Sequence, residues 1–172
     1  VLCETDMAGN AVRDYGLIND EALQQTLDLA KQYISLDDST AADALQAITL
    51  DDFRDGSYYD DAMASDGTFS PEKTDVSIQL KWLPQAQFMG FFVADALGYY
   101  EDAGFTSVNI ISGGGDIGET TAVNNGTADF GTTWVSNLIA ANAGGMDLLE
   151  VGQTFQRSGL VLVYKYQNFQ NE

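Results

Sequence analysis

The chain has no histidine and a single cysteine, Cys3, among its 172 residues. Without histidine, Ser-His-Asp catalysis, Cys-His catalysis and histidine-based metal sites are excluded. One cysteine cannot form an internal disulfide or a multi-cysteine metal site. No apolar run approaches the roughly 20 residues that a membrane-spanning helix needs. These absences favour a protein that is not an enzyme and holds neither a metal ion nor a cofactor.

Basic residues are also scarce, because 7 Lys and Arg stand against 26 Asp and Glu, a net charge of −19. A nucleic-acid partner needs a basic surface, which this chain lacks, and an anionic membrane surface is equally unfavourable. The acidity fits a secreted or salt-exposed protein. The acidic run at 51–66 lacks the glycine and terminal glutamate of a calcium loop, so we expect a solvated surface there. No signal-peptide pattern is present, so the sequence is expected to be mature or to omit that peptide.

Hydrophobic residues make up 45% of the chain and aromatic residues 11%, which is enough for one globular domain with a core. The first third of the chain predicts helices. Asn19 is expected to cap a helix over 20–35. Ser39 or Thr40 is expected to cap a second helix, and a short turn follows at 50–53.

The stretch from 75 to 131 alternates strand-like, helix-like and glycine-rich pieces at short intervals. This alternation predicts right-handed βαβ units on a parallel sheet. The expected fold class is α/β, a three-layer αβα arrangement with a mostly parallel sheet of about five strands. The expected strands lie at 76–80, 108–111, 128–133, 148–153 and 160–166, and the expected helices of this region lie at 88–103, 117–125 and from 135 to 143.

Ligands of such sheets bind at the carboxyl ends of the strands. The loops at 83–87, 112–117 and 132–136 are therefore expected to lie together at this edge of the sheet, which we call the rim. Trp82 and Trp134 offer indoles that can stack on a flat heteroaromatic ring, although each could instead be a core or hinge aromatic. Ser136 follows on the third loop.

Polar and glycine positions complete the candidate ligand-binding set. Gln85 and Gln87 carry donors and acceptors suited to the edge of a pyrimidine or an isoalloxazine, and either could instead cap the helix that follows. Gly114, in a run of three glycines, lets the backbone approach a ligand closely or simply makes a tight turn. Asp116 is expected either to cap the next helix or to contact ligand. Gln156 follows the fourth expected strand.

Four segments, in their order along the chain, resemble the solute-binding proteins of ABC importers in the NMT1/THI5-like group. They are KWLPQAQFMGFFVADALGYYEDAGF, ISGGGDI, NNGTADFGTTWV and GQTFQRSGLVLVYK. The resemblance covers about residues 75–167. It implies one lobe of a type II periplasmic-binding-protein fold, in which two α/β lobes close on a small-molecule ligand.

The resemblance also implies a ligand, a partner and a location. KWLPQAQF and FQRSG look closest to the branch that binds riboflavin or thiamine-precursor pyrimidines, while other relatives take sulfonates or nitrate. The implied partner is an ABC permease, and the implied location is extracytoplasmic, either periplasmic or lipid-anchored at the cell surface. THI5-like enzymes consume a histidine of their own and use a cysteine-rich iron motif, which this composition cannot supply.

The order of the parts departs from the family pattern. Residues 1–63 resemble the family's C-terminal tail, expected to pack on the same lobe, and 64–74 is the expected linker. Residues 75–172 are then the βαβ core of lobe one, ending at the hinge strand. This order suggests a circular permutation without the second lobe, or alternatively an unrelated N-terminal extension. The cleft face would meet the missing lobe or self-associate. A stand-alone or engineered flavodoxin-like scaffold and a small-anion receptor are the alternative functions.

Overall fold

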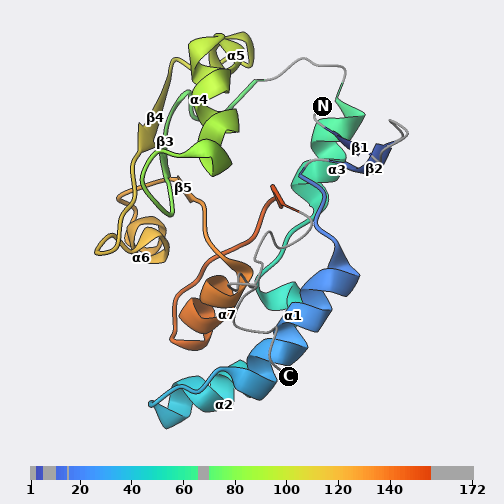
Figure 1. Ribbon diagram of the computed structural model, residues 1–172, viewed down its shortest axis with the longest axis vertical. Helices are drawn as coiled ribbons and strands as arrows, with labels where there is room; N and C mark the ends of the chain where they lie inside the picture. The colour runs from blue at the N-terminus through green and yellow to red at the C-terminus, as the bar shows by residue number, and fades with distance from the viewer. Residues whose placement is uncertain (1–2, 6–10, 15, 66–69, 156–172) are drawn as a thin grey trace, which may run out of the picture.

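The computed structural model describes residues 3–5, 11–14, 16–65 and 70–155. These residues form an α/β structure with seven α-helices, a three-stranded sheet and a separate two-stranded sheet. Figure 1 shows two groups of elements: the three-stranded sheet with α4, α5 and α6, and a helical group made by α1, α2 and α7. The α/β class expected from the sequence is confirmed.

The first helix, α1 (Asp20–Tyr33), begins where the sequence predicted it. The side-chain oxygen of Asn19 accepts a hydrogen bond from the backbone N–H of Ala22 at 3.0 Å, which satisfies one of the free donors of the first turn. Leu23 and Leu27, one helical turn apart, are both buried. The expected cap and the expected buried face are therefore confirmed.

The second helix, α2 (Ser39–Ala47), is capped by a different residue from those expected. Asp38, rather than Ser39 or Thr40, accepts the hydrogen bond from the Ala41 N–H, at 2.9 Å. An aspartate at this position has a carboxylate that suits both the free N–H groups and the helix dipole. The short turn after it is confirmed as the 3-10 helix η1 (Leu50–Asp52), and the acidic run unexpectedly forms the helix α3 (Ser57–Ala64).

The central sheet has the strand order β4-β3-β5 and all three strands are parallel. Its strands are β3 (Asp75–Gln79), β4 (Ser107–Ile111) and β5 (Phe130–Gly131). Crossovers that run through helices are what place sequential strands parallel to one another. The predicted parallel sheet is confirmed for these three strands.

The prediction of a single long helix over 88–103 is wrong. The chain instead forms the 3-10 helix η2 (Ala86–Phe88) and two helices, α4 (Met89–Ala96) and α5 (Tyr99–Asp102). The break falls at Gly98, whose φ of 74° lies in the left-handed region. Glycine adopts this conformation without the steric cost that other residues carry, so the apolar periodicity continues while the backbone turns.

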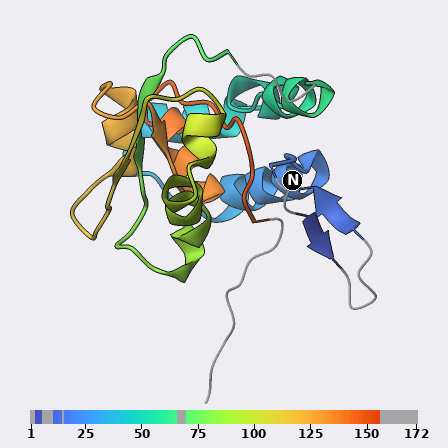
Figure 2. The ribbon, with the colours of Figure 1, turned by 90° about the horizontal axis from the view of Figure 1, so that it is seen from above.

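The remaining elements differ from expectation in length. The helices α6 (Glu119–Asn124) and α7 (Val135–Ala143) are present, but 148–153 forms only isolated bridges instead of a strand. The strand expected at 160–166 lies outside the described residues. An antiparallel pair, β1 (Cys3–Thr5) and β2 (Ala11–Asp14), lies away from the central sheet, as Figures 1 and 2 both show.

The main apolar core lies in the helical group and joins sequence segments that are far apart. It contains Ile18, Leu23, Leu27, Ala30, Leu45, Phe53, Leu138, Ile139, Ala143 and Leu148. Backbone hydrogen bonds hold the same segments together: Gly16 N–H donates to the Gln153 carbonyl at 3.1 Å, and Asp55 N–H donates to the Glu150 carbonyl at 2.9 Å. Burial of this apolar surface stabilises the junction of the N-terminal helices with α7. Among the described residues, no helix is long and apolar enough to cross a membrane.

Candidate functional site

The carboxyl end of the sheet is where the first two rim loops touch. Gly113 N–H donates to the Trp82 carbonyl at 3.0 Å. A Cβ atom on Gly113 would lie 2.1 Å from the carbonyl oxygen of Leu80, closer than atoms can approach. Only glycine therefore allows the loop after β4 to lie directly on the backbone that follows β3.

The loop after β5 reaches the same place. Thr132 N–H donates to the Gln79 carbonyl at 3.0 Å, and the Thr132 hydroxyl accepts from the Lys81 N–H at 2.9 Å. The loops at 112–117 and 132–136 thus meet at the carboxyl end of β3, against the residues that lead into the loop at 83–87. This position agrees with the general location of ligand sites in parallel α/β sheets.

A buried ion pair lies at this meeting point. The Glu119 side chain, at the start of α6, is only 4% exposed, and its Oε1 accepts from Lys81 Nζ at 2.7 Å. The same oxygen accepts from the Thr133 hydroxyl at 2.5 Å. Burial raises the pKa of Glu119, but the hydrogen bonds from Lys81 and Thr133 outweigh burial and hold that pKa below its usual value. One carboxylate therefore connects the loops that follow β3 and β5 to α6.

A buried glutamine closes the base of the rim. Gln79 is 4% exposed, and its side-chain Nε2 donates to the carbonyl of Leu80 at 3.2 Å and to that of Ser112 at 3.1 Å. These carbonyls lie past the ends of β3 and β4, where no ladder partner continues. The amide thus supplies donors to backbone acceptors that burial would otherwise leave unpaired.

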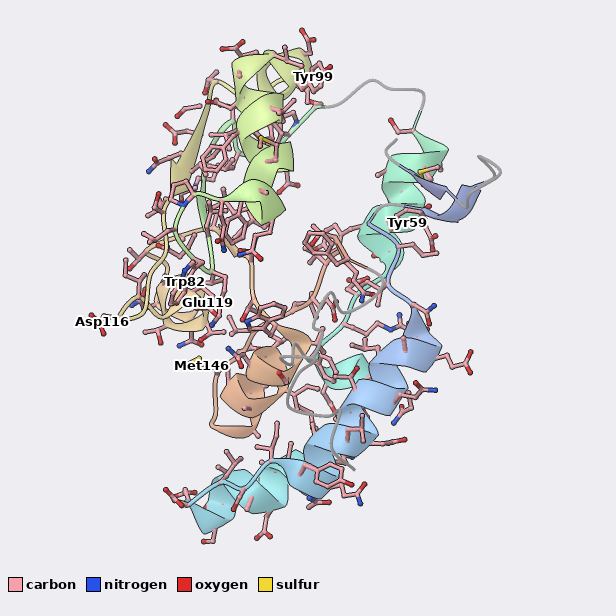
Figure 3. The ribbon with its side chains drawn as sticks, in the orientation of Figure 1. Tyr59, Trp82, Tyr99, Asp116, Glu119 and Met146 are labelled. Carbon is pink, nitrogen blue, oxygen red and sulfur yellow. The ribbon has the colours of Figure 1, made fainter. Side chains whose placement is uncertain are left out.

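Trp82, in contrast to these buried polar side chains, is open to solvent. Its side chain lies in contact range of Gly115, because a Cβ at Gly115 would be 3.9 Å from the indole Cη2. Trp82 is 43% exposed, which excludes it from the core. Figure 3 shows Trp82, Glu119 and Asp116 gathered at one end of the sheet, next to α6.

Trp134 and Ser136 lie at the start of α7. Trp134 is 55% exposed, so its indole is not a core aromatic, and its carbonyl accepts the N–H groups of Asn137 and Leu138 as the helix begins. Ser136, in the first turn, is exposed. Both residues follow Thr132 and Thr133 directly in the chain, so they lie next to the residues that contact Lys81 and Glu119.

Gln85 and Gln87 are both exposed and belong to the η2 segment. Gln85 is the residue before η2, and its backbone carbonyl accepts from the Phe88 N–H at 2.9 Å. Its side chain makes no capping hydrogen bond. The alternative of a Gln85 side-chain cap is therefore wrong, because the backbone carbonyl fills that place.

Gly114, which is half-buried, and Asp116, which is exposed, lie in a turn between β4 and α6. The Ile117 N–H donates to the Gly114 carbonyl at 3.2 Å, so the glycine run is a tight turn in this structure. Asp116 does not cap the helix, since α6 begins at Glu119 with Gly118 as its N-cap residue. The capping expected of Asp116 is wrong for that reason. Gln156 lies outside the described residues.

The buried polar partners Lys81 and Glu119 were not predicted as site residues. Lys81 and Glu119 are 38 residues apart and show no shared motif, so only the fold brings them together. A weak signal was present, because each is a charged residue at the junction of an expected strand or helix with a rim loop. No group of three or more metal-ligating side chains occurs in the described ranges.

Two hollows in the described part of the chain lie away from the rim. One, of about 210 Å³, lies between the α4–α5 turn and the start of β4. The other, of about 160 Å³, has mainly apolar walls between the sheet and α4–α5, including Val76, Phe91 and Phe130. The rim residues line neither of these hollows.

A protein-family model described as "NMT1/THI5 like" matches residues 85–169. No curated protein and no solved structure matched the chain significantly. The matched stretch starts in the first rim loop and includes the second and third, from Gln85 through the glycine turn to α7. Residues 85–169, just under half of the chain, are therefore similar to the NMT1/THI5-like family.

Proposed function

We propose that this chain is a lobe of the solute-binding protein of an ABC importer and that its rim binds a small planar heterocycle. The observation that carries the proposal is the exposed indole of Trp82, placed beside the glycine turn at the carboxyl end of the parallel sheet. The NMT1/THI5-like domain over 85–169 supports a binding role, since the group consists largely of solute-binding proteins. Riboflavin and thiamine-precursor pyrimidines fit an indole that stacks on a flat ring.

An open rim has a consequence for affinity. Ligand sites usually bury most of the ligand surface, whereas Trp82 and Trp134 on this rim are about half exposed. We therefore propose that the cleft is completed by a second lobe, and that this lobe alone binds ligand weakly. The proposed lobe is of the three-layer type II periplasmic-binding-protein class, and the proposed partner of the complete receptor is an ABC permease outside the cytoplasm.

The packing of the N-terminal helices bears on the proposed permutation. Residues 16–54 share the apolar core with α7 and bond to the backbone at 150 and 153. An unrelated extension would have no need of such an extensive shared core. We therefore propose that 1–63 is an integral part of this lobe, corresponding to the family's C-terminal tail placed first, and that 64–74 is the linker.

Two other functions receive less support. A small-anion receptor needs an available cation, yet Lys81 is paired with Glu119 at the rim. The enzymes of the THI5 branch need a histidine and several cysteines, and the whole chain contains no histidine and one cysteine. A stand-alone flavodoxin-like scaffold would also place a flavin at the carboxyl ends of its strands, so riboflavin binding fits both functions, whereas hydroxymethylpyrimidine binding favours the receptor lobe.

The test is an NMR titration of the chain with riboflavin and, separately, with hydroxymethylpyrimidine, up to millimolar ligand. We expect shift changes confined to the loops at 81–82, 113–117 and 132–136. Trp82→Ala is expected to abolish them, because the stacking surface is removed. Tyr33→Ala is the matched control, since Tyr33 is an exposed aromatic on α1, remote from the rim. Shift changes elsewhere, or none at millimolar ligand, would contradict the assignment of this rim to a planar heterocycle.

A further inference from the structure

The Lys81–Glu119 pair has two features that a surface ion pair lacks. The carboxylate side chain is 4% exposed and the lysine side chain 25% exposed, so both charges are largely withdrawn from water. In addition, the carboxylate oxygen that binds Lys81 also accepts from Thr133, on a different rim loop. Removing one member of such a pair leaves the other charge without its partner, which has larger effects than loss of an exposed pair.

Lys81 is also the residue directly before Trp82, the proposed stacking platform. An unpaired ammonium at this position would attract anions toward the indole. With Glu119 in contact at 2.7 Å, the two charges cancel at short range. Glu119 therefore offsets the positive charge that Lys81 would otherwise contribute next to Trp82.

We propose that Glu119 is a specificity-determining and positioning residue of the rim: it neutralises Lys81 and holds Lys81 and Thr133 in place, so that Lys81 does not draw anions to the rim and uncharged planar rings are favoured. This inference rests on the proposed function for its ligand. Its electrostatic part does not, because the charge beside Trp82 is a property of the chain alone.

The electrostatic part is tested without ligand by fluorescence quenching. Trp134→Phe leaves Trp82 as the single tryptophan, since the chain has two. Glu119→Gln in this background removes the negative charge while keeping an oxygen that can accept from Thr133. A unit charge at about 8 Å in water changes the local concentration of a monovalent ion about twofold at low salt. We expect iodide quenching to rise about twofold and quenching by neutral acrylamide to stay unchanged.

Two further variants separate charge from structure. Asp129→Asn also removes a carboxylate from an ion pair, with Lys73, but that pair lies toward the amino end of β3, where Asp129 also bonds Ser77. We expect it to leave iodide quenching of Trp82 nearly unchanged. Lys81→Met combined with Glu119→Gln removes both charges and is expected to return iodide quenching to the parent value. A merely structural role of Glu119 would not produce this reversal.

The ligand part is tested with riboflavin and riboflavin 5′-phosphate, which share the ring and differ in charge. We expect the parent rim to favour riboflavin, and Glu119→Gln to shift the ratio of the two affinities toward the phosphate by at least about twofold, for the same electrostatic reason. Unchanged iodide quenching in folded Glu119→Gln would overturn the inference whatever the ligand result. A quenching change with no binding of either flavin would leave the charge assignment standing and contradict the proposed function instead. If Glu119→Gln does not fold, the variant that combines Lys81→Met with Glu119→Gln is the test. Iodide quenching of this variant that differs from the parent would overturn the inference that the two charges cancel.

Discussion

The carboxyl group of Glu150 has one buried oxygen without a hydrogen-bond partner, and its ionisation gives a specific prediction about stability and pH. Its backbone bonds both sides of the junction, donating to the Phe53 carbonyl at 2.7 Å and accepting from the Asp55 N–H. Its Oε2 atom is buried with no hydrogen-bond partner among the described residues. Burial, and secondarily the carboxylate of Asp20, raises the pKa of Glu150 to about 7.

The sign and size of the effect follow from this raised pKa. A carboxyl group whose pKa is higher in the folded state favours folding while it is protonated. Its contribution is fully present below the ordinary pKa of 4.5 and is lost as pH rises to about 7. Each pKa unit corresponds to about 1.4 kcal/mol, so the loss over this range is about 3 kcal/mol. Above pH 7 the contribution changes no further.

The perturbation is Glu150→Gln, which keeps the size of the side chain and cannot ionise. We expect the free energy of unfolding of the variant to exceed that of the parent at pH 8 by about 3 kcal/mol more than it does at pH 4.5. Urea unfolding followed by tryptophan fluorescence at several pH values measures this difference. Glu72→Gln is the matched control, since Glu72 is exposed. A difference between Glu150→Gln and parent that is constant from pH 4.5 to 8 would refute the reasoning.

Two other predictions concern the supports of the sheet. Gly113→Ala is expected to lower the free energy of unfolding by about 2 kcal/mol or more, because its Cβ would lie 2.1 Å from the Leu80 carbonyl oxygen. Gly114→Ala, which has open space around it, should change the free energy of unfolding by less than about 0.5 kcal/mol. Equal effects of the two variants in urea unfolding would disprove the close approach. The hydrogen bond from Lys73, followed by those from Ser77, lowers the pKa of Asp129 from 3.8 to about 2. The ionised Asp129 should therefore stabilise the fold above pH 3.8, and this contribution should be lost as pH falls through about 2. The difference in the free energy of unfolding between the parent and Asp129→Asn should then become smaller in acid. A difference that does not change with pH over this range would contradict the prediction.

Much of the candidate site was predictable because the ends of strands can be recognised from a few neighbouring residues. The apolar alternation that ends at Leu80 and the glycine run at Gly113 predict strand ends, and a parallel sheet then brings their loops to one edge. Trp82 is placed at that edge for this reason. The finer assignments failed where a single backbone angle or a distant partner decided the outcome, as with the break at Gly98 and the cap expected of Asp116.

The sequence by itself determined the α/β class, the parallel order of the three strands, the helix that starts after Asn19 and the exclusion of histidine chemistry. Each of these depends on composition or on neighbours within a few residues. Only the tertiary structure decided the pairing of Lys81 with Glu119, and the burial of the Glu150 Oε2 atom without a hydrogen-bond partner. These contacts join residues far apart in sequence, and neither the charge state of a buried group nor its partner is encoded in local periodicity.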